Sequence, residues 1–161
     1  MKTTKPTPVR VACRAKTPLG VFTALYEDGI IRRVLFPDET ANALYTEFDD
    51  TLPFAVQMSE YFAGQRRRFE LPVLIPGTPF RQSVYRAAMA IPYGRTASYS
   101  DVALAAGHPL AMRAVGTAMK LNQLPLIIPC HRVVHKAANR DAYRGGVDLK
   151  SFLLTLEEQH A

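Results

Sequence analysis

Three prolines and a glycine fall within residues 72–79, and this segment divides the chain into two parts of different character. Proline lacks a backbone N–H and fixes φ, so such a segment interrupts both helices and central strands. The 161 residues are 48% hydrophobic, which is enough apolar material for one domain or two small ones. We therefore predict an α+β protein with an N-terminal lobe over residues 1–76 and a C-terminal lobe over residues 77–161.

The N-terminal lobe is predicted to be a small β-sheet with one helix. β-forming residues are concentrated in three segments, residues 9–14, 20–26 and 29–36. The Asp28-Gly29 pair between the last two is typical of a tight hairpin turn. Residues 52–62 have the spacing of a helix that ends before Gly64.

The C-terminal lobe is predicted to be mainly helical. Thr78 is a good N-cap, and Pro79 fits the first turn of a helix that runs to about residue 91. A last helix is predicted over residues 148–159, where leucine and phenylalanine recur at helical spacing.

Two short helices in the middle of this lobe form a predicted helix-turn-helix. Ser98 and Asp101 resemble a capping box that opens the first helix, which ends at Gly107. The second helix spans residues 110–121, with Met112, Val115 and Met119 on one face and Arg113, Thr117 and Lys120 on another. The basic face is flanked by small residues, which let a helix approach a narrow DNA groove closely. Ordinary helix packing through the alanines is the alternative.

The net charge of +6 is distributed unevenly. Residues 1–76 hold ten Lys/Arg against nine Asp/Glu, a net +1, whereas residues 77–161 hold ten against five, a net +5. A basic excess confined to one half favours a polyanion-binding surface, although many domains are mildly basic without such a role. The run Arg66, Arg67 and Arg68 is interpreted as a solvated turn, with a phosphate contact as the alternative.

A thiol and an imidazole stand side by side in residues 128–134, Ile-Pro-Cys-His-Arg-Val-Val. An apolar environment raises the pKa of a thiol, whereas a neighbouring imidazole or guanidinium lowers it. The pairing therefore favours Cys130 as a nucleophile, held by a rigid, proline-rich connection. A buried structural cysteine is the alternative, but His131 and Arg132 follow directly and Asn122 precedes by eight residues.

Glu157 is the candidate partner for the imidazole of His131. It lies on the flank of the apolar stripe of the last helix, whereas Glu158 points nearly opposite. A flanking carboxylate can reach a buried imidazole and fix its tautomer, as pairs of nucleophile and base generally require. Glu158 is predicted to be a surface charge.

Several kinds of site are excluded by what the sequence lacks. It contains no run of 18 apolar residues and no apolar signal core, so we expect a cytoplasmic protein that does not enter a membrane. The four histidines and two cysteines, Cys13 and Cys130, show no zinc-type spacing, so no metal is predicted and both thiols are expected to be free. The glycine-rich loop that binds a soluble methyl donor is missing, and no cofactor is predicted.

Several short motifs resemble, in order and spacing, those of the methylated-DNA–protein-cysteine methyltransferase family, the 6-O-methylguanine-DNA alkyltransferases. The matching stretches are Gly77-Thr78-Pro79-Phe80, Ile91-Pro92-Tyr93-Gly94, Ser98-Tyr99, Arg113-Ala114-Val115-Gly116, residues 125–134, Tyr143 with Gly145-Gly146, and Leu153-Leu154 before Glu157. They cover most of residues 77–157. Similarity in the N-terminal lobe is weaker, at residues 17–20 and 61–64, and implies a ribonuclease-H-like lobe.

The resemblance implies a DNA repair enzyme that uses each molecule once. Cys130 would accept the alkyl group from the O6 atom of guanine in one displacement and would not be regenerated. His131 is implied to act as the base through a bound water, with Glu157 orienting it and Asn122 supporting the turn. The partner is alkylated double-stranded DNA, with alkylated thymine as a further substrate class. No protein partner is expected, and nothing in the sequence indicates an oligomer.

The resemblance also implies how the damaged base is reached. Because the reacting oxygen lies inside a stacked duplex, the nucleotide must be flipped out. Arg113 would fill the gap that it leaves, Tyr99 would help to turn the nucleotide and donate a hydrogen bond to the base, and the second helix would enter the minor groove. Further DNA contacts are implied for Ser100, His108 and Lys136, and a base pocket lined by Met119, Val133, Tyr143 and Arg144.

Three positions depart from the family pattern. Gln123 replaces a proline after the asparagine, Tyr85 replaces a tryptophan, and Ala142 stands where a glycine often precedes the tyrosine. None of them removes a reactive group, so they bear on pocket shape rather than on the reaction. Two other hypotheses are a damage sensor of the same architecture, which would lack the reactive cysteine, and a thiol hydrolase, for which no oxyanion motif is visible.

Overall fold

The computed structural model describes residues 4–136 and 147–161. The chain forms two units, one made of Met1–Ser59 and Glu70–Leu74 and the other of Glu60–Phe69 and Ile75–Ala161. Residues 60–69, which precede the proline-rich segment, therefore group with the C-terminal residues. These described residues form a small antiparallel sheet and five α-helices, and the predicted α+β class is confirmed.

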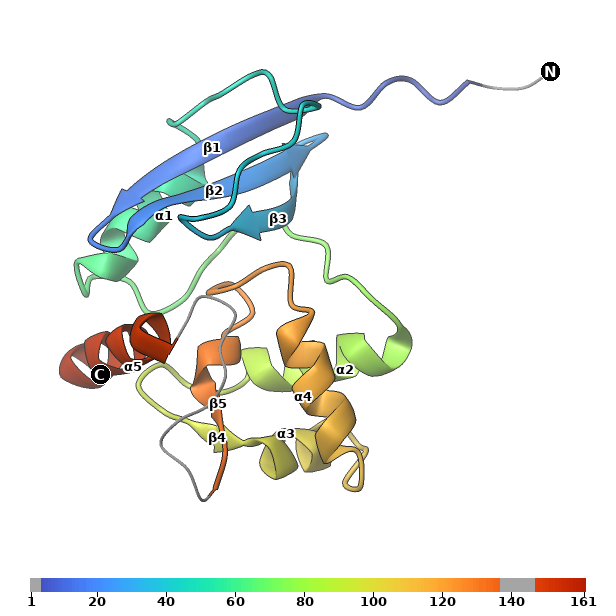
Figure 1. Cartoon of the computed structure of the whole chain (residues 1–161), viewed down its shortest axis with the longest axis vertical. Coiled ribbons are helices and arrows are strands. Elements are labelled where there is room, and N and C mark those ends of the chain that lie inside the picture. Colours follow the sequence, from blue (N-terminus) through green and yellow to red (C-terminus); the bar gives the residue numbers. More distant parts are fainter. Residues whose placement is uncertain (1–3, 137–146) are drawn as a thin grey trace. The chain divides into compact units, whose positions relative to one another are not determined.

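The first unit is built on a three-stranded antiparallel sheet (Figure 1), whose strands are β1 (Arg10–Thr17), β2 (Gly20–Glu27) and β3 (Ile30–Leu35), in the order β1-β2-β3. The predicted hairpin turn is present, with Asp28 and Gly29 both in the left-handed region at φ 51° and 78°. Ala12, Leu25 and Leu35 are buried and pack with the partly buried Ala41 and Tyr45. Helix α1 (Pro53–Phe62) follows, as predicted.

The second unit is mainly helical (Figure 1), and its elements are α2 (Pro79–Met89), β4 (Ala97–Ser98), α3 (Tyr99–Ala105), α4 (Met112–Lys120), the 3₁₀ turn η1 (Cys130–Arg132), β5 (Val133–Val134) and α5 (Val147–His160). Helices α2, α3 and α4 pack against one another, and β4 pairs in parallel with β5. The strand pair fixes the residues after η1 next to the start of α3.

The local signals for these helices are confirmed. The Thr78 hydroxyl accepts from the Arg81 backbone N–H at 3.3 Å and caps α2. At α3, Ser98 and Asp101 form the reciprocal capping box, with N···O distances of 3.1 and 3.0 Å. Such caps satisfy backbone N–H groups that a helix leaves unpaired at its start.

The predicted apolar face of α4 is partly wrong. Val115, Ala118 and Met119 are buried, but Met112 is 49% exposed. Met112 is the first residue of α4, and helical side chains lean toward the N-terminus, so its side chain extends past the packed face. It joins the basic side chains of the helix instead.

Within the described residues, no helix has the length and apolar character needed to cross a membrane. Those residues also contain no group of three or more His, Cys, Asp or Glu side chains arranged to hold a metal ion. Both cysteines are buried and neither forms a disulfide; Cys13 lies in β1 and Cys130 at the start of η1. Burial raises the pKa of the Cys13 thiol to about 11, which makes it a poor nucleophile.

Candidate active site

The turn that carries Cys130 is held together by one buried side chain. The Asn122 amide oxygen accepts from the Leu124 backbone N–H at 2.9 Å, and its nitrogen donates to the Ile128 carbonyl at 2.9 Å. The backbone closes the same turn with a bond from the Ile128 N–H to the Leu124 carbonyl at 2.8 Å. Asn122 therefore fixes the connection between α4 and η1.

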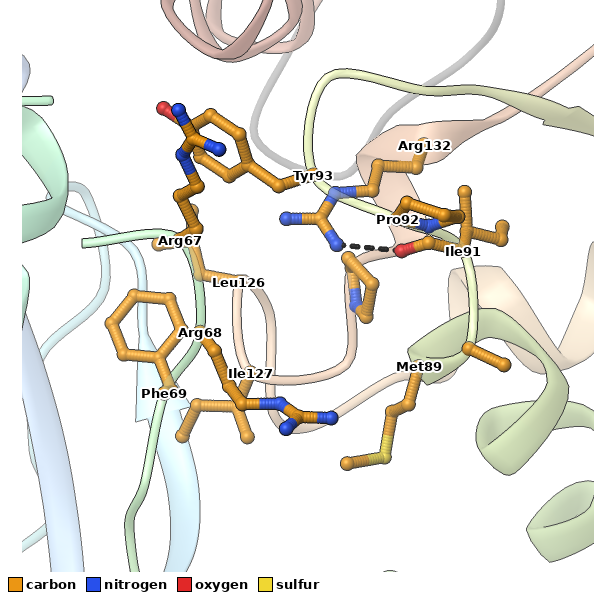
Figure 2. A pocket seen from close by; sticks show the side chains of 12 residues that line it. Arg67, Arg68, Phe69, Met89, Ile91, Pro92, Tyr93, Leu126, Ile127 and Arg132 are labelled. Carbon is orange, nitrogen blue, oxygen red and sulfur yellow. Dashed lines mark hydrogen bonds between the residues drawn. The ribbon is translucent and has the colours of Figure 1, made fainter. Parts of the chain in front are cut away.

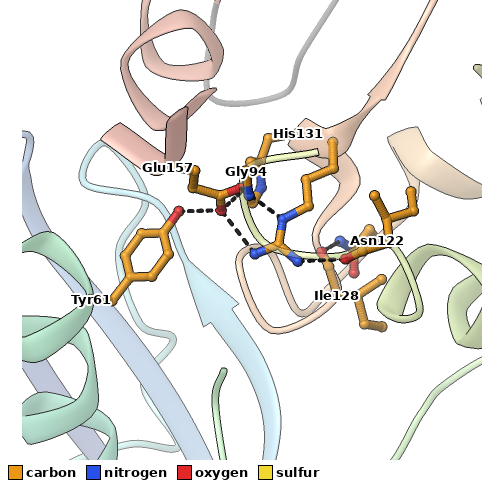
Figure 3. Close-up of polar contacts among 8 residues, drawn as sticks. Tyr61, Gly94, Asn122, Ile128, His131 and Glu157 are labelled. Carbon is orange, nitrogen blue, oxygen red and sulfur yellow. Dashed lines mark hydrogen bonds and ion pairs between the residues drawn. The ribbon is translucent and has the colours of Figure 1, made fainter. Parts of the chain in front are cut away.

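The same amide nitrogen also reaches the sulfur. Asn122 Nδ2 lies 3.2 Å from Cys130 Sγ. Its two N–H groups therefore serve the thiol and the Ile128 carbonyl, and Figure 3 shows Asn122 beside Ile128. A donor to sulfur favours the anionic form over the neutral form. Cys130 is 7% exposed, so this contact lies in a largely dry environment. The predicted pair of Asn122 and Cys130 is thus brought into direct contact.

His131 and Glu157 also meet, 26 residues apart in the sequence. His131 Nε2 lies 2.7 Å from Glu157 Oε1, and both side chains have no exposed area (Figure 3). Arg132 joins them through Nε, which donates to Oε2 at 2.8 Å, and Nη2, which donates to Oε1 at 2.9 Å. The fork of the guanidinium matches the carboxylate and neutralises its buried charge.

The protonation states follow from these contacts. Burial raises the pKa of Glu157, but the hydrogen bonds from His131 and Arg132 outweigh it and bring the pKa to about 2. Burial lowers the pKa of His131, against the hydrogen bond and charge of Glu157, which raise it. The lowered pKa of His131 and the lowered pKa of Glu157 both favour a neutral imidazole beside an ionised carboxylate. Its Nε2 then carries the proton and donates to Glu157, which leaves Nδ1 as an acceptor.

The second ring nitrogen of His131, Nδ1, faces away from the contact with Glu157. It is buried and has no hydrogen-bond partner among the described residues. A buried polar nitrogen without a partner is costly, so such a group points to a water or a reacting proton at that position. The nitrogen belongs to the residue directly after Cys130.

Three contributors to the cluster were missed by the sequence analysis. The Tyr61 hydroxyl donates to Glu157 Oε1 at 2.7 Å, and the Gly94 backbone N–H donates to Oε2 at 3.3 Å. Lys150 is buried, and its Nζ donates to the Val133 carbonyl at 2.8 Å. Tyr61 and Gly94 both lie in short motifs that match the family, but nothing in the sequence assigns them a partner.

The basic face of α4 lines a hollow of about 250 Å3. Arg113 and Lys120 line it from α4, and Tyr99 and His135 line it from outside that helix. The rings of Tyr99 and His135 are in contact, with centroids 4.7 Å apart. Arg113, Lys120 and Lys136 are exposed, so the cations are available to an anionic partner. Two predicted DNA contacts thus line one hollow, Tyr99 and Arg113.

The other predicted DNA contacts lie elsewhere on the second unit. Ser100 is on α3, where its hydroxyl is 3.0 Å from that of Ser98. His108 follows α3, is exposed and packs edge-on against the Phe80 ring with centroids 4.9 Å apart. Lys136 follows β5. All three residues lie on or directly after elements of the helix-turn-helix and its strand pair.

Comparison with known proteins decides the family. A family model described as the DNA-binding domain of 6-O-methylguanine DNA methyltransferase matches residues 79–159. The constitutive methylated-DNA–protein-cysteine methyltransferase of Bacillus subtilis is 41% identical over 152 residues, which cover 89% of this chain and 92% of that protein. The chain belongs to the methylated-DNA–protein-cysteine methyltransferase family.

Other members of the family support the assignment. The enzyme of Mycolicibacterium paratuberculosis is 36% identical, with 90% of each chain covered. The crystal structure of Mycobacterium tuberculosis O6-methylguanine methyltransferase matches with a TM-score of 0.84 at 31% identity, covering 96% of this chain and 95% of that one. A second structure of the Mycobacterium tuberculosis protein, in complex with DNA, matches with a TM-score of 0.85 at 32% identity over 94% of both chains.

Membership makes the chain an enzyme of the methylated-DNA–protein-cysteine methyltransferase class, with a DNA-binding domain and a role in DNA repair. Of the residues that the family pattern implies for the base pocket, Met119 and Val133 are buried. Tyr143 and Arg144 lie outside the described residues.

The structure describes two of the three positions that depart from the family pattern. The Tyr85 hydroxyl donates to the Ala118 carbonyl at 2.9 Å, and the Gln123 side chain is exposed. Ala142 lies outside the described residues.

A pocket of about 420 Å3 borders the turn that leads to Cys130 (Figure 2). Leu126, Ile127 and Pro129 line it from the turn, together with Arg68. At its edge Arg132 Nη1 donates to the Ile91 carbonyl at 2.9 Å. Arg132 thereby connects η1 to the segment that follows α2 as well as to Glu157.

Proposed function

We propose that this protein repairs DNA by moving the methyl group from the O6 atom of guanine in duplex DNA to Cys130, once per molecule. The sulfur of the thiolate forms a bond to the methyl carbon, and the bond from that carbon to the guanine oxygen breaks with its electrons going to guanine. Loss of a methyl group from a thioether is difficult, so the product S-methylcysteine remains and the molecule is spent.

The observation that carries the proposal is a sulfur held by Asn122 in the residue directly before a buried imidazole. Asn122 Nδ2 lies 3.2 Å from Cys130 Sγ, and His131 Nδ1 is an acceptor without a partner among the described residues. In the proposed reaction the thiol proton passes to His131 through a bound water. Glu157, 2.7 Å from Nε2, stabilises the imidazolium that forms.

DNA binding is proposed to use the basic face of α4 in the minor groove. Its exposed residues include Arg113, Ala114 and Thr117, and small side chains let the backbone come close to the groove. Since the O6 atom is hidden in the stack, the nucleotide is flipped out at a cost of a few kcal/mol. Arg113 fills the gap, and Tyr99 turns the nucleotide and donates a hydrogen bond to the departing guanine, which gains negative charge.

The remaining assignments extend this proposal. Ser100, His108 and Lys136 contact the DNA backbone, and the flipped base enters a pocket lined by Met119, Val133, Tyr143 and Arg144. The O4 atom of alkylated thymine is a second substrate, since it presents the same alkyl–oxygen bond. The protein acts as a monomer in the cytoplasm, without a cofactor. The N-terminal lobe, predicted over residues 1–76, has a ribonuclease-H-like fold.

The deciding experiment uses duplex DNA that carries 6-O-methylguanine with a labelled methyl group. After incubation, the protein is digested and the label is located by mass spectrometry. We expect one label per molecule on the peptide that contains Cys130, full loss of transfer in Cys130→Ala, and normal transfer in Cys13→Ala. The Cys13 variant is the matched control, because its thiol is also buried.

The same experiment separates the alternatives. Label released into solution with repeated turnover would identify a thiol hydrolase. Binding of the damaged duplex without any label on the protein would identify a damage sensor. Label on Cys13, or unmodified Cys130 while the DNA is repaired, would overturn the proposal.

A further inference from the structure

The buried carboxylate of Glu157 accepts a hydrogen bond from a phenol that has no part in the proposed reaction. The Tyr61 hydroxyl lies 2.7 Å from Glu157 Oε1, the same oxygen that His131 Nε2 contacts at 2.7 Å (Figure 3). Tyr61 is 1% exposed and belongs to the same unit as His131 and Glu157. A phenol that shares an acceptor oxygen with the proposed base is well placed to act on that base.

The Tyr61 ring is held in a fixed orientation by three aromatic neighbours. Phe62 and Phe69 each have ring centroids 5.3 Å from that of Tyr61, and Tyr93 packs edge-on at 6.1 Å. Burial, followed by the charge of Glu157, raises the pKa of Tyr61 well above its ordinary value. The phenol therefore keeps its proton and can act toward the carboxylate only as a donor.

Within residues 4–136 and 147–161, three charged groups act on His131. Glu157 and Lys150 approach from α5, and Arg132 approaches from η1. Glu157 attracts the imidazolium form, whereas the two cations repel it. Tyr61 carries no charge, so its influence on His131 must pass through the shared oxygen Oε1.

The shared oxygen already accepts three hydrogen bonds, from Tyr61, His131 and Arg132 Nη2. A hydrogen bond to a carboxylate favours its ionised form and lowers its affinity for a further proton. The Tyr61 bond therefore makes Glu157 a weaker attractor for the Nε2 proton and for the imidazolium as a whole. Removing it strengthens the bond from His131 and favours protonation of the ring.

We propose that Tyr61 is a positioning residue for methyl transfer, which, by donating to the oxygen that His131 shares, keeps the imidazole neutral and ready to accept the Cys130 proton. The inference rests on the proposed function of His131 as the proton acceptor. It explains why tyrosine, rather than phenylalanine, stands at position 61, where its hydroxyl contacts a buried carboxylate whose charge Arg132 already balances.

The test compares Tyr61→Phe with Tyr93→Phe. Phenylalanine keeps the ring packing in both variants and removes only a hydroxyl. Tyr93 is the matched control because its hydroxyl is buried and has no hydrogen-bond partner among the described residues. Two quantities are measured: the proton resonance of His131 Nε2–H in the free protein, and the single-turnover rate of transfer from pH 5 to 9.

In Tyr61→Phe we expect the Nε2–H resonance to move downfield, because the remaining bond to Oε1 shortens. The acid limb of the rate profile should move to higher pH by about half to one pH unit, the effect of a partial change in a charge-assisted hydrogen bond. Tyr93→Phe should leave both quantities unchanged. A purely structural role would lower the rate without moving the acid limb.

The outcomes separate this inference from the proposed function. A resonance in Tyr61→Phe that matches the wild type overturns the role of Tyr61, and this measurement needs no DNA. An equal shift in Tyr93→Phe also overturns it, because loss of packing would then be the cause. Absence of methyl transfer in the wild-type protein would overturn the proposed function while the resonance still reports on the shared oxygen.

Discussion

The amide nitrogen of Asn122 lies 3.2 Å from the sulfur of Cys130 and 2.9 Å from the carbonyl oxygen of Ile128. One side chain therefore both shapes the turn and contacts the sulfur of the proposed nucleophile. This double contact makes Asn122 the most informative position at which to perturb the sulfur without removing it.

Replacing Asn122 with alanine should slow methyl transfer by about 10- to 100-fold, since a hydrogen bond to a charged group contributes about 1.5–3 kcal/mol. Single-turnover kinetics with methylated duplex measure the effect. Gln123→Ala is the control, because the neighbouring amide is exposed. A wild-type rate in Asn122→Ala would show that the sulfur does not depend on this donor.

Replacing Glu157 with glutamine should lower the free energy of unfolding by about 3–5 kcal/mol, because the buried guanidinium of Arg132 loses its counter-ion. Urea unfolding at pH 7 measures this loss. Glu158→Gln, one residue further along α5 and exposed, should change stability very little. Equal effects of the two substitutions would argue against the buried ion pair.

Stability should fall as the pH drops below about 6.5. The pKa of His131 is lowered by burial, so the unfolded chain takes up a proton in a range where the folded protein does not. The pKa of Glu157 is lowered from 4.5 to about 2, so its contribution is complete above pH 4.5 and is lost as the pH falls toward 2. The contributions of His131 and Glu157 to the free energy of unfolding therefore both decrease as the pH falls.

Urea unfolding at a series of pH values from 7.5 to 3.5 measures this dependence. Between pH 7 and 5 the decline should be smaller in His131→Gln, which has no imidazole to protonate. A constant free energy of unfolding over that range in the wild type would mean that His131 is not held in its neutral form.

Replacing Arg113 with alanine should slow repair of the duplex more than reaction with the free 6-O-methylguanine base. Flipping costs a few kcal/mol, and only the duplex reaction needs a side chain to fill the stack. The ratio of the two rates is the measurement, and Arg86→Ala, an exposed arginine on α2, is the control. Equal losses on the two substrates would contradict the stack-filling role.

Much of the fold follows from local signals in the sequence. The Asp28-Gly29 turn sets the ends of β2 and β3, and the caps at Thr78 and Ser98 set the starts of α2 and α3. These signals act over a few residues, so they can be read without knowledge of the rest of the chain. The first turn of α4 was less predictable, because helical spacing alone does not show that Met112 is the first residue of the helix and extends past its packed face.

The contact between His131 and Glu157 was predictable in kind, because helical periodicity puts Glu157 beside the apolar stripe of α5. The contacts of Glu157 with Tyr61 and Arg132 were not predictable from the sequence. Tyr61 is separated from Glu157 by 96 residues, and only packing of the folded unit brings the two together. Arg132 was recognised as a cation near the thiol, but not as a ligand of Glu157 and of the Ile91 carbonyl.

The grouping of residues 60–69 with the C-terminal part of the chain has a practical consequence. A truncated gene that starts at the proline-rich segment would encode the cysteine, the imidazole and the carboxylate, and would still omit the phenol of Tyr61. Such a module would retain every atom of the proposed reaction but would lack the hydrogen bond that Tyr61 donates to Glu157. A truncation at the proline-rich segment would therefore remove part of the buried cluster around His131.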